Sequence, residues 1–230
     1  PTYNAKRHAL GSANYSSELD PYNVRRLTLL GELRGAIENR QLFLNYQPKV
    51  DLTTNRAVGV EALLRWKHPQ HGLVPPGEFI PVAEQSDLIR NLTYWVMDEA
   101  LLQCHVWRQM GYMLNVAINL SPRNLHDPGF PIKVGGLLAK WAVPASAITL
   151  EITENAIMID PERALKILLR LNLMGINLSI DDFGTGYSSL LYLKRLPVSQ
   201  IKVDRSFVMD MTHDKDDAII VQSTIDLGHN

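Results

Sequence analysis

The feature that most constrains the fold is an alternation of short apolar stretches with longer amphipathic ones. The short stretches have the composition of strands and lie at Leu42–Val50, Ala57–Trp66, Asn115–Leu120, Ile148–Thr153, Asn177–Asp181 and Gln200–Asp204. The longer ones carry apolar residues on one helical face, at Asp20–Glu38, Asn91–Met110, Ile132–Trp141, Pro161–Leu173, Ser188–Arg195 and Asp216–Leu227. Strands that alternate with helices favour a parallel sheet covered by helices.

The first two predicted strands are an exception to this alternation. Only the segment Asp51–Arg56 separates them. A parallel crossover needs about a dozen residues or more, so these two strands should pair antiparallel. Strands in this order, with one antiparallel strand at the start, fit a (β/α) barrel better than a doubly wound sheet. The predicted class is therefore α/β.

Composition excludes several classes of protein. The 230 residues are 46% hydrophobic and 20% charged with a formal net charge of -1, so nothing indicates binding to a nucleic-acid polymer. The single cysteine, Cys104, cannot form an internal disulfide and fits a reducing compartment. No apolar stretch reaches the roughly 20 residues that span a bilayer. We expect a cytoplasmic domain without membrane contact of its own, although a longer parent protein could carry an anchor.

Acidic and amide side chains gather where the predicted strands end. In a (β/α) barrel these ends meet at one mouth, where active sites lie. Carboxylates placed so close together need a compensating cation, and an all-oxygen set suits Mg²⁺ or Mn²⁺. Two ions at such a site favour phosphoryl transfer to water. Each acid taken alone could equally cap a helix or be solvated. The residues are Glu61, Asn119, Glu151, Glu154, Asp181, Asp182, Lys202 and Asp204.

Ordered motifs give this pattern a family resemblance. Glu61–Trp66 reads Glu-Ala-Leu-Leu-Arg-Trp and resembles the signature after which the EAL family is named. The resemblance runs from about Leu33 to the end of the chain. Further segments are similar to the family's other motifs, in the same order: Tyr46–Pro48, Asn119–Pro122, Glu151–Glu154, Asp181–Ser189 and Lys202–Phe207.

The resemblance implies a fold and an activity. EAL domains are TIM-like (β/α)8 barrels with an antiparallel first strand. They hydrolyse cyclic di-GMP to linear pGpG with Mg²⁺ or Mn²⁺, two ions per site, and Ca²⁺ inhibits them. The family pattern places Glu61, Asn119, Glu151 and Asp181 on one metal ion and Asp182 on the second.

The same pattern assigns catalytic and supporting roles. Glu61, Lys202 and Asp204 would act at the reaction centre, with Lys202 near the attacking water or the phosphoryl charge. Glu154 would brace the loop Phe183–Ser189. The substrate would contact Gln47, Leu63 and Arg65. Glu61, Leu63 and Arg65 alternate and so share one face of their strand, and a guanidinium suits a phosphate. The pairs Glu61–Arg65 and Lys202–Asp204 could instead be structural ion pairs. His68 and His71 are expected at the surface.

The two ends of the chain depart from a lone EAL domain. The family's last two strands, with an Ala-Glu-Gly-Val-Glu-like motif, are absent from the sequence. We expect further chain to follow; the alternative is an open sheet with exposed edges. Residues 1–19 are expected to be a linker, 20–40 a connecting helix and 41–230 the EAL domain. Tyr3–Arg7 is similar to the end of a GGDEF domain, so the parent protein should carry a GGDEF or sensory domain.

Two other functions stay open at this point. An EAL domain can serve as a receptor that binds cyclic di-GMP without cutting it, although such proteins usually lose metal ligands. A different metal-dependent barrel hydrolase would share the strand-end acids but not the ordered motifs. Dimers are common in the family, so a homodimer is a further expectation.

Overall fold

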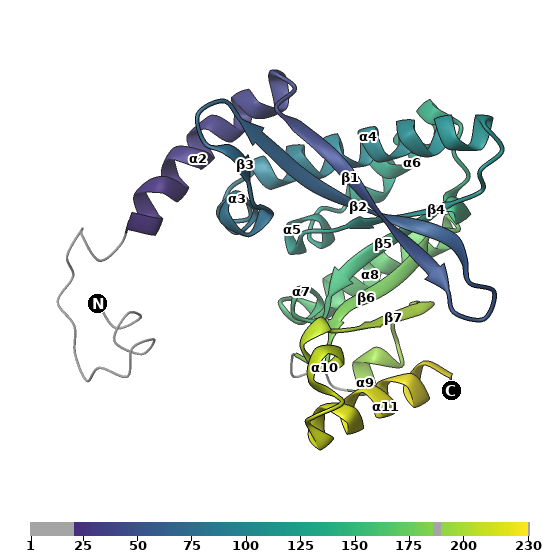
Figure 1. The fold of residues 1–230 in the computed structure, drawn as a ribbon. Helices are drawn as coiled ribbons and strands as arrows, with labels where there is room; N and C mark the ends of the chain where they lie inside the picture. Colours follow the sequence, from purple (N-terminus) through teal and green to yellow (C-terminus); the bar gives the residue numbers. More distant parts are fainter. Residues whose placement is uncertain (1–20, 186–189, 230) are drawn as a thin grey trace, which may run out of the picture.

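The strands form one mostly parallel sheet in a computed structural model that describes residues 21–185 and 190–229. Its order is β1-β2-β4-β5-β6-β7, with β3 paired to β2 (Figure 1). The bounds are β1 Leu42–Asp51, β2 Arg56–His68, β3 Gly72–Val74, β4 Asn115–Asn119, β5 Ile148–Thr153, β6 Asn177–Phe183 and β7 Gln200–Val203. The predicted linker at 1–19, the GGDEF-like Tyr3–Arg7 and loop residues 186–189 lie outside the described residues.

Strand directions confirm the prediction for the start of the sheet. β1 and β2 pair antiparallel, and every later neighbouring pair along the sheet order is parallel. All six predicted strands are present, and β5 has the predicted bounds. The three-residue β3 was not predicted because so short a segment shows no periodicity. It pairs antiparallel with the end of β2.

Helices cover one face of this sheet, with α4 and α6 lying side by side in Figure 1. All the predicted helices are present, although the start of the one predicted at Ser188–Arg195 lies outside the described residues. The short helices α3, α5, α7 and α10 were missed. The bounds are α2 Pro21–Glu38, α3 Pro76–Ala83, α4 Leu88–Gln109, α5 Pro122–Leu125, α6 Phe130–Trp141, α7 Glu154–Met158, α8 Pro161–Leu173, α9 Leu190–Leu193, α10 Arg205–Asp210 and α11 Lys215–His229.

Three of the missed helices begin within three residues of a strand end and are capped by the residue that precedes them. The side chains of Ser121, Thr153 and Asp204 accept backbone N–H groups at the starts of α5, α7 and α10. Such caps satisfy donors that the first turn leaves unpaired. The mouth of the sheet is therefore lined by short helices that bend the chain away from each strand end.

The two faces of β2 separate core from site. Ala62, Leu64 and Trp66 are buried on the helix-covered face. Glu61 lies on the opposite face and is only partly buried. Because successive side chains point to opposite faces of a strand, one run of sequence serves both purposes. The helix-covered face holds the core, and the other face is free to carry polar groups.

The prediction that His68 lies at the surface was wrong, whereas His71 is exposed as expected. His68 is only 5% exposed. Its Nε2 lies 2.9 Å from Glu32 Oε2 on α2. Its Nδ1 accepts the backbone N–H groups of Gln70 and His71, at 3.1 and 3.2 Å. The imidazole is covered by this contact with α2 and by the stacked ring of His71, whose centroid lies 4.5 Å away.

Gly59 is expected to be intolerant of a side chain. A Cβ at this position would lie 2.7 Å from the backbone oxygen of Asn115 in β4. Gly59→Ala should therefore destabilise the domain by about 1–3 kcal/mol through overpacking. Gly136→Ala on the exposed side of α6 is the control, because nothing lies within 4 Å of its Cβ. It should stabilise by about 0.5–1 kcal/mol. Urea unfolding measures both, and equal effects would contradict the close approach of β2 and β4.

Candidate active site

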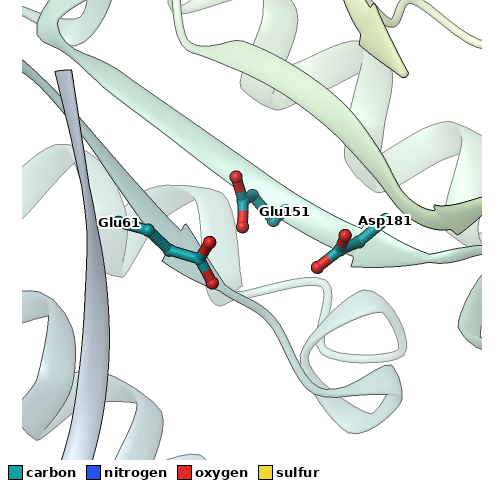
Figure 2. A group of neighbouring side chains, drawn as sticks. All are labelled: Glu61, Glu151 and Asp181. Atoms are coloured by element: carbon teal, nitrogen blue, oxygen red, sulfur yellow. The ribbon is translucent and has the colours of Figure 1, made fainter. Parts of the chain in front are cut away.

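Three carboxylates from three strands meet on the face opposite the helices. Glu61, Glu151 and Asp181 come from β2, β5 and β6 and point toward one another in Figure 2. Each offers an oxygen within 4.8 Å of the others. The Glu151 side chain is fully buried, whereas those of Glu61 and Asp181 are 17% and 18% exposed. Acids so close in a partly dry environment require cationic partners.

Lys202 on β7 supplies one of these partners. Its Nζ lies 2.7 Å from Glu151 Oε2, 3.0 Å from Asp181 Oδ2 and 3.2 Å from Glu61 Oε2. Burial opposes the charge of this ammonium. Hydrogen bonds and charges from Glu151 and Asp181 outweigh burial, so the pKa of Lys202 is raised above its ordinary value. The lysine is held charged among the three carboxylates.

Asn119 sits at the end of β4 and contacts the cluster from one side. Its Nδ2 donates a hydrogen bond of 2.8 Å to Glu61 Oε1. Burial would raise the pKa of Glu61, but this hydrogen bond and the charge of Lys202 lower it overall. Glu61 is therefore held as a carboxylate, with the Asn119 amide fixed beside it.

A second lysine, Lys49 on β1, belongs to the site and was missed by the sequence analysis. Its Nζ lies 2.5 Å from Glu151 Oε1. In the antiparallel pairing Gln47 lies opposite Glu61 and Lys49 opposite Gly59, so all four residues share a face. The available signal was the two-residue step from Gln47 to Lys49, because alternate residues of a strand point the same way.

The adjacent acids Asp181 and Asp182 lie at an irregularity in β6. The register with β7 shifts between Ile180 and Phe183, and Asp182 has a φ of 53°. Bulges of this kind re-aim side chains near functional sites. Partial burial and the negative charges of Asp181 and Asp204 raise the pKa of Asp182. A cation bound beside Asp182 would offset this repulsion.

Asp204 has a structural role at the start of α10. Its Oδ1 accepts the backbone N–H of Ser206 at 2.8 Å and also the Ser206 hydroxyl. The hydroxyl and then the backbone hydrogen bond lower the pKa of Asp204. The residue caps α10. Its negative charge also raises the pKa of Asp182, which shows that it lies beside the acidic cluster.

Glu154 contacts the loop that follows β6. Gly184 donates its N–H to Glu154 Oε2 at 3.2 Å. Gly184 has a φ of 99°, a conformation that favours glycine. Glu154 itself is only 3% exposed. The described part of the loop is therefore tied to the helix α7, which begins at Glu154.

The residues predicted to contact substrate lie on β1 and β2. A cavity of about 300 Å³ borders Leu63, Arg65 and Asn119, but it extends toward α3 and α4, because its lining also includes the buried residues Ala62, Leu64 and Leu92. Arg65 Nη1 donates to the backbone oxygen of Leu64 at 2.8 Å, which leaves its other N–H groups for a ligand. Gln47 is exposed on β1, opposite Glu61.

Comparison with known proteins decides the family. Residues 30–230 match the family model described as EAL domain. This chain belongs to the EAL domain family. Members are TIM-like barrels, in agreement with the α/β sheet and its antiparallel first strand. The family match begins within α2, whose Leu33 and Ala36 are fully buried against the rest of the domain.

Relatives of this EAL domain include proteins named as phosphodiesterases. It is 47% identical over 219 residues to the bifunctional diguanylate cyclase/cyclic di-GMP phosphodiesterase MucR of Pseudomonas aeruginosa, covering 95% of this chain and 32% of that protein. A cyclic di-GMP phosphodiesterase of the same organism is 40% identical, covering 97% and 38%. The chain thus spans about a third of the length of these curated relatives.

A solved structure of a relative has the same fold. The MucR phosphodiesterase in complex with c-di-GMP superposes with a TM-score of 0.84 at 49% identity, covering 88% of this chain and 82% of that one. In the described part of the present chain, no helix combines the length and the apolar composition needed to cross a membrane.

Proposed function

We propose that this EAL domain hydrolyses cyclic di-GMP to linear pGpG with the help of Mg²⁺ or Mn²⁺. The observation that carries the proposal is the convergence of Glu61, Glu151 and Asp181 around Lys202, in a family whose relatives are named cyclic di-GMP phosphodiesterases. In the reaction, water adds across one phosphodiester bond. The ring opens to a phosphate monoester at one guanosine and a free hydroxyl at the other.

The donor set fits a divalent cation that prefers oxygen. One oxygen of each of the three carboxylates lies within 4.8 Å of the others, and the Glu151 carboxylate is fully buried. Such a cluster of negative charge is unfavourable unless positive charge is near. Oxygen ligands without nitrogen or sulfur suit Mg²⁺ or Mn²⁺. Glu61, Asn119, Glu151 and Asp181 would hold one ion, and Asp182 would contribute to a second. Two such ions make water nucleophilic at neutral pH and stabilise both oxygens of an in-line displacement.

The side chains of the chain itself would position the phosphodiester. Lys202 has an ammonium beside all three acids and would donate to the attacking water or to charge that develops on the phosphoryl oxygens. Arg65 lies on the same face of β2 as Glu61, and its planar guanidinium suits a phosphate. Gln47 and Leu63 would contact the nucleotide. Asp204 would support the metal and water network through Asp182.

The whole protein is proposed to contain a further signalling domain. The chain spans 32% of MucR, which is named as both a cyclase and a phosphodiesterase. A GGDEF-type or sensory domain would therefore accompany the EAL domain, with α2 as the connection between them.

Metal removal provides the first test of the proposed activity. The whole protein should convert cyclic di-GMP to pGpG in Mg²⁺ or Mn²⁺, lose all measurable turnover in EDTA and regain it when the ion is restored, because the proposed reaction depends on ions held by the carboxylate cluster. Chromatography follows the product, and calorimetry follows binding of cyclic di-GMP in parallel. Tight binding in Mg²⁺ with no pGpG after hours would show a receptor instead of an enzyme. Absence of both binding and turnover would contradict the proposal altogether.

A further inference from the structure

Each of the three clustered carboxylates has one oxygen held by a donor of the protein. Glu61 Oε1 accepts from Asn119 Nδ2 at 2.8 Å. Asp181 Oδ1 accepts from the backbone N–H of Asp182 at 3.1 Å. Glu151 Oε1 pairs with Lys49 Nζ at 2.5 Å. The remaining oxygen of each residue faces the centre of the cluster, where all three contact Lys202 Nζ. The site therefore presents three single oxygens to its centre.

Lys49 is the charged member among these three donors, and its position is built into the sheet. The register of β1 with β2 shifts between Lys49 and Val50, and such bulges re-aim neighbouring side chains. The Lys49 side chain is 31% exposed, whereas its partner Glu151 is fully buried. A charge-assisted hydrogen bond of this length to a buried carboxylate is stronger than a neutral one. Glu151 is thus the most firmly oriented acid of the cluster.

We propose that Lys49 keeps Glu151 a one-oxygen ligand and thereby weakens the binding of Ca²⁺ relative to that of Mg²⁺ and Mn²⁺. The inference rests on the proposed metal site. Mg²⁺ takes octahedral geometry with oxygens at about 2.0–2.1 Å, whereas Ca²⁺ takes six to eight oxygens at about 2.3–2.6 Å and readily binds both oxygens of a carboxylate. Because Lys49 holds Oε1, Oε2 is the Glu151 oxygen that is presented to an ion bound beside Lys202.

Lys49→Met tests this role by removing the donor at similar side-chain length. Glu151 Oε1 would become free, and Glu151 could then bind Ca²⁺ through both oxygens. We expect the ratio of the dissociation constants for Ca²⁺ and Mn²⁺ to fall by about 10-fold or more, in line with the effect of other outer-shell partners. Calorimetric titration with each metal, at fixed pH and without nucleotide, measures both constants independently of turnover.

Three further variants make the test specific. Lys49→Arg should keep the wild-type ratio, because a guanidinium can still donate to Oε1. Lys49→Gln is shorter and uncharged and should lower the ratio as Lys49→Met does; it replaces that variant if Lys49→Met does not fold. Lys67→Met, on an exposed position of β2, should leave the ratio unchanged.

The outcomes separate this inference from the proposed function. If both affinities change by the same factor in Lys49→Met, the lysine acts only through its charge, and the inference is wrong. A lower melting temperature with unchanged affinities would also overturn it, because Lys49 would then be merely structural. Both of these results leave the phosphodiesterase proposal standing. A wild-type chain that binds no Mn²⁺ would overturn the metal site itself and the inference together.

Discussion

Replacing Glu61 by glutamine is expected to lower the turnover of cyclic di-GMP by about 10³-fold while the fold stays intact. A glutamine keeps the size of the side chain and can still accept the hydrogen bond from Asn119 Nδ2. It loses the negative charge toward the centre of the cluster. A metal ion that stabilises the transition state contributes several kcal/mol, and each 1.36 kcal/mol corresponds to a factor of ten in rate. Initial rates of pGpG formation in saturating Mg²⁺ measure the effect.

Glu162→Gln is the matched control for this variant. Glu162 is a surface acid on α8 that pairs with Arg195 at 3.2 Å, and its side chain is 60% exposed. Its replacement removes the same charge from the chain and should leave turnover within about twofold, since exposed ion pairs contribute little. Circular dichroism and thermal unfolding establish that both variants fold. Wild-type turnover in a folded Glu61→Gln variant would contradict the assignment of this residue to the site.

Lys202→Met is expected to abolish measurable turnover and also to destabilise the chain in EDTA by about 2–3 kcal/mol. The substitution leaves three carboxylates without the ammonium that contacts them all. Removing one partner of a buried pair costs about 3–5 kcal/mol; the 28% exposure of the Lys202 side chain reduces this figure. Added Mn²⁺ should recover part of the lost stability, because the cation neutralises the same acids. Urea unfolding in EDTA and in Mn²⁺ measures the difference.

Lys140→Met provides the comparison for Lys202→Met. Lys140 Nζ lies 2.7 Å from Asp98 Oδ1, the same length as the contact between Lys202 and Glu151. That pair is exposed on the surface, so its loss should cost less than about 1 kcal/mol and should not respond to Mn²⁺. If both lysine variants lose the same stability, burial of the carboxylate cluster is not what makes Lys202 important.

Much of the fold could be predicted from local patterns. The strand Ile148–Thr153 was predicted with its observed bounds because apolar and polar residues alternate along it, and a period of two indicates a strand. The antiparallel pairing of β1 with β2 followed from the short connection between them. Short helices such as α5 and α10 were missed, because one or two turns do not establish a period and depend on a capping side chain.

The acids of the site could be predicted in part for a similar reason. Strand ends of a parallel sheet meet at one edge, so Glu151 and Asp181 were expected to be neighbours before their distances were known. The ordered motifs identified the same residues independently, and the family match confirms the resemblance. The catalytic and ligand roles of the individual residues stay predictions that the experiments above test.

The sequence alone thus determined the order of the elements, the direction of the first strand and the family. Only the tertiary structure decided which atoms meet. Lys49 reaches Glu151 across a separation of 102 residues, and His68 is buried because α2 lies over its turn. Periodicity reports the face on which a side chain lies, but a hydrogen bond depends on positions within tenths of an ångström. Those positions are set by register, bulges and packing between elements that are distant in the chain.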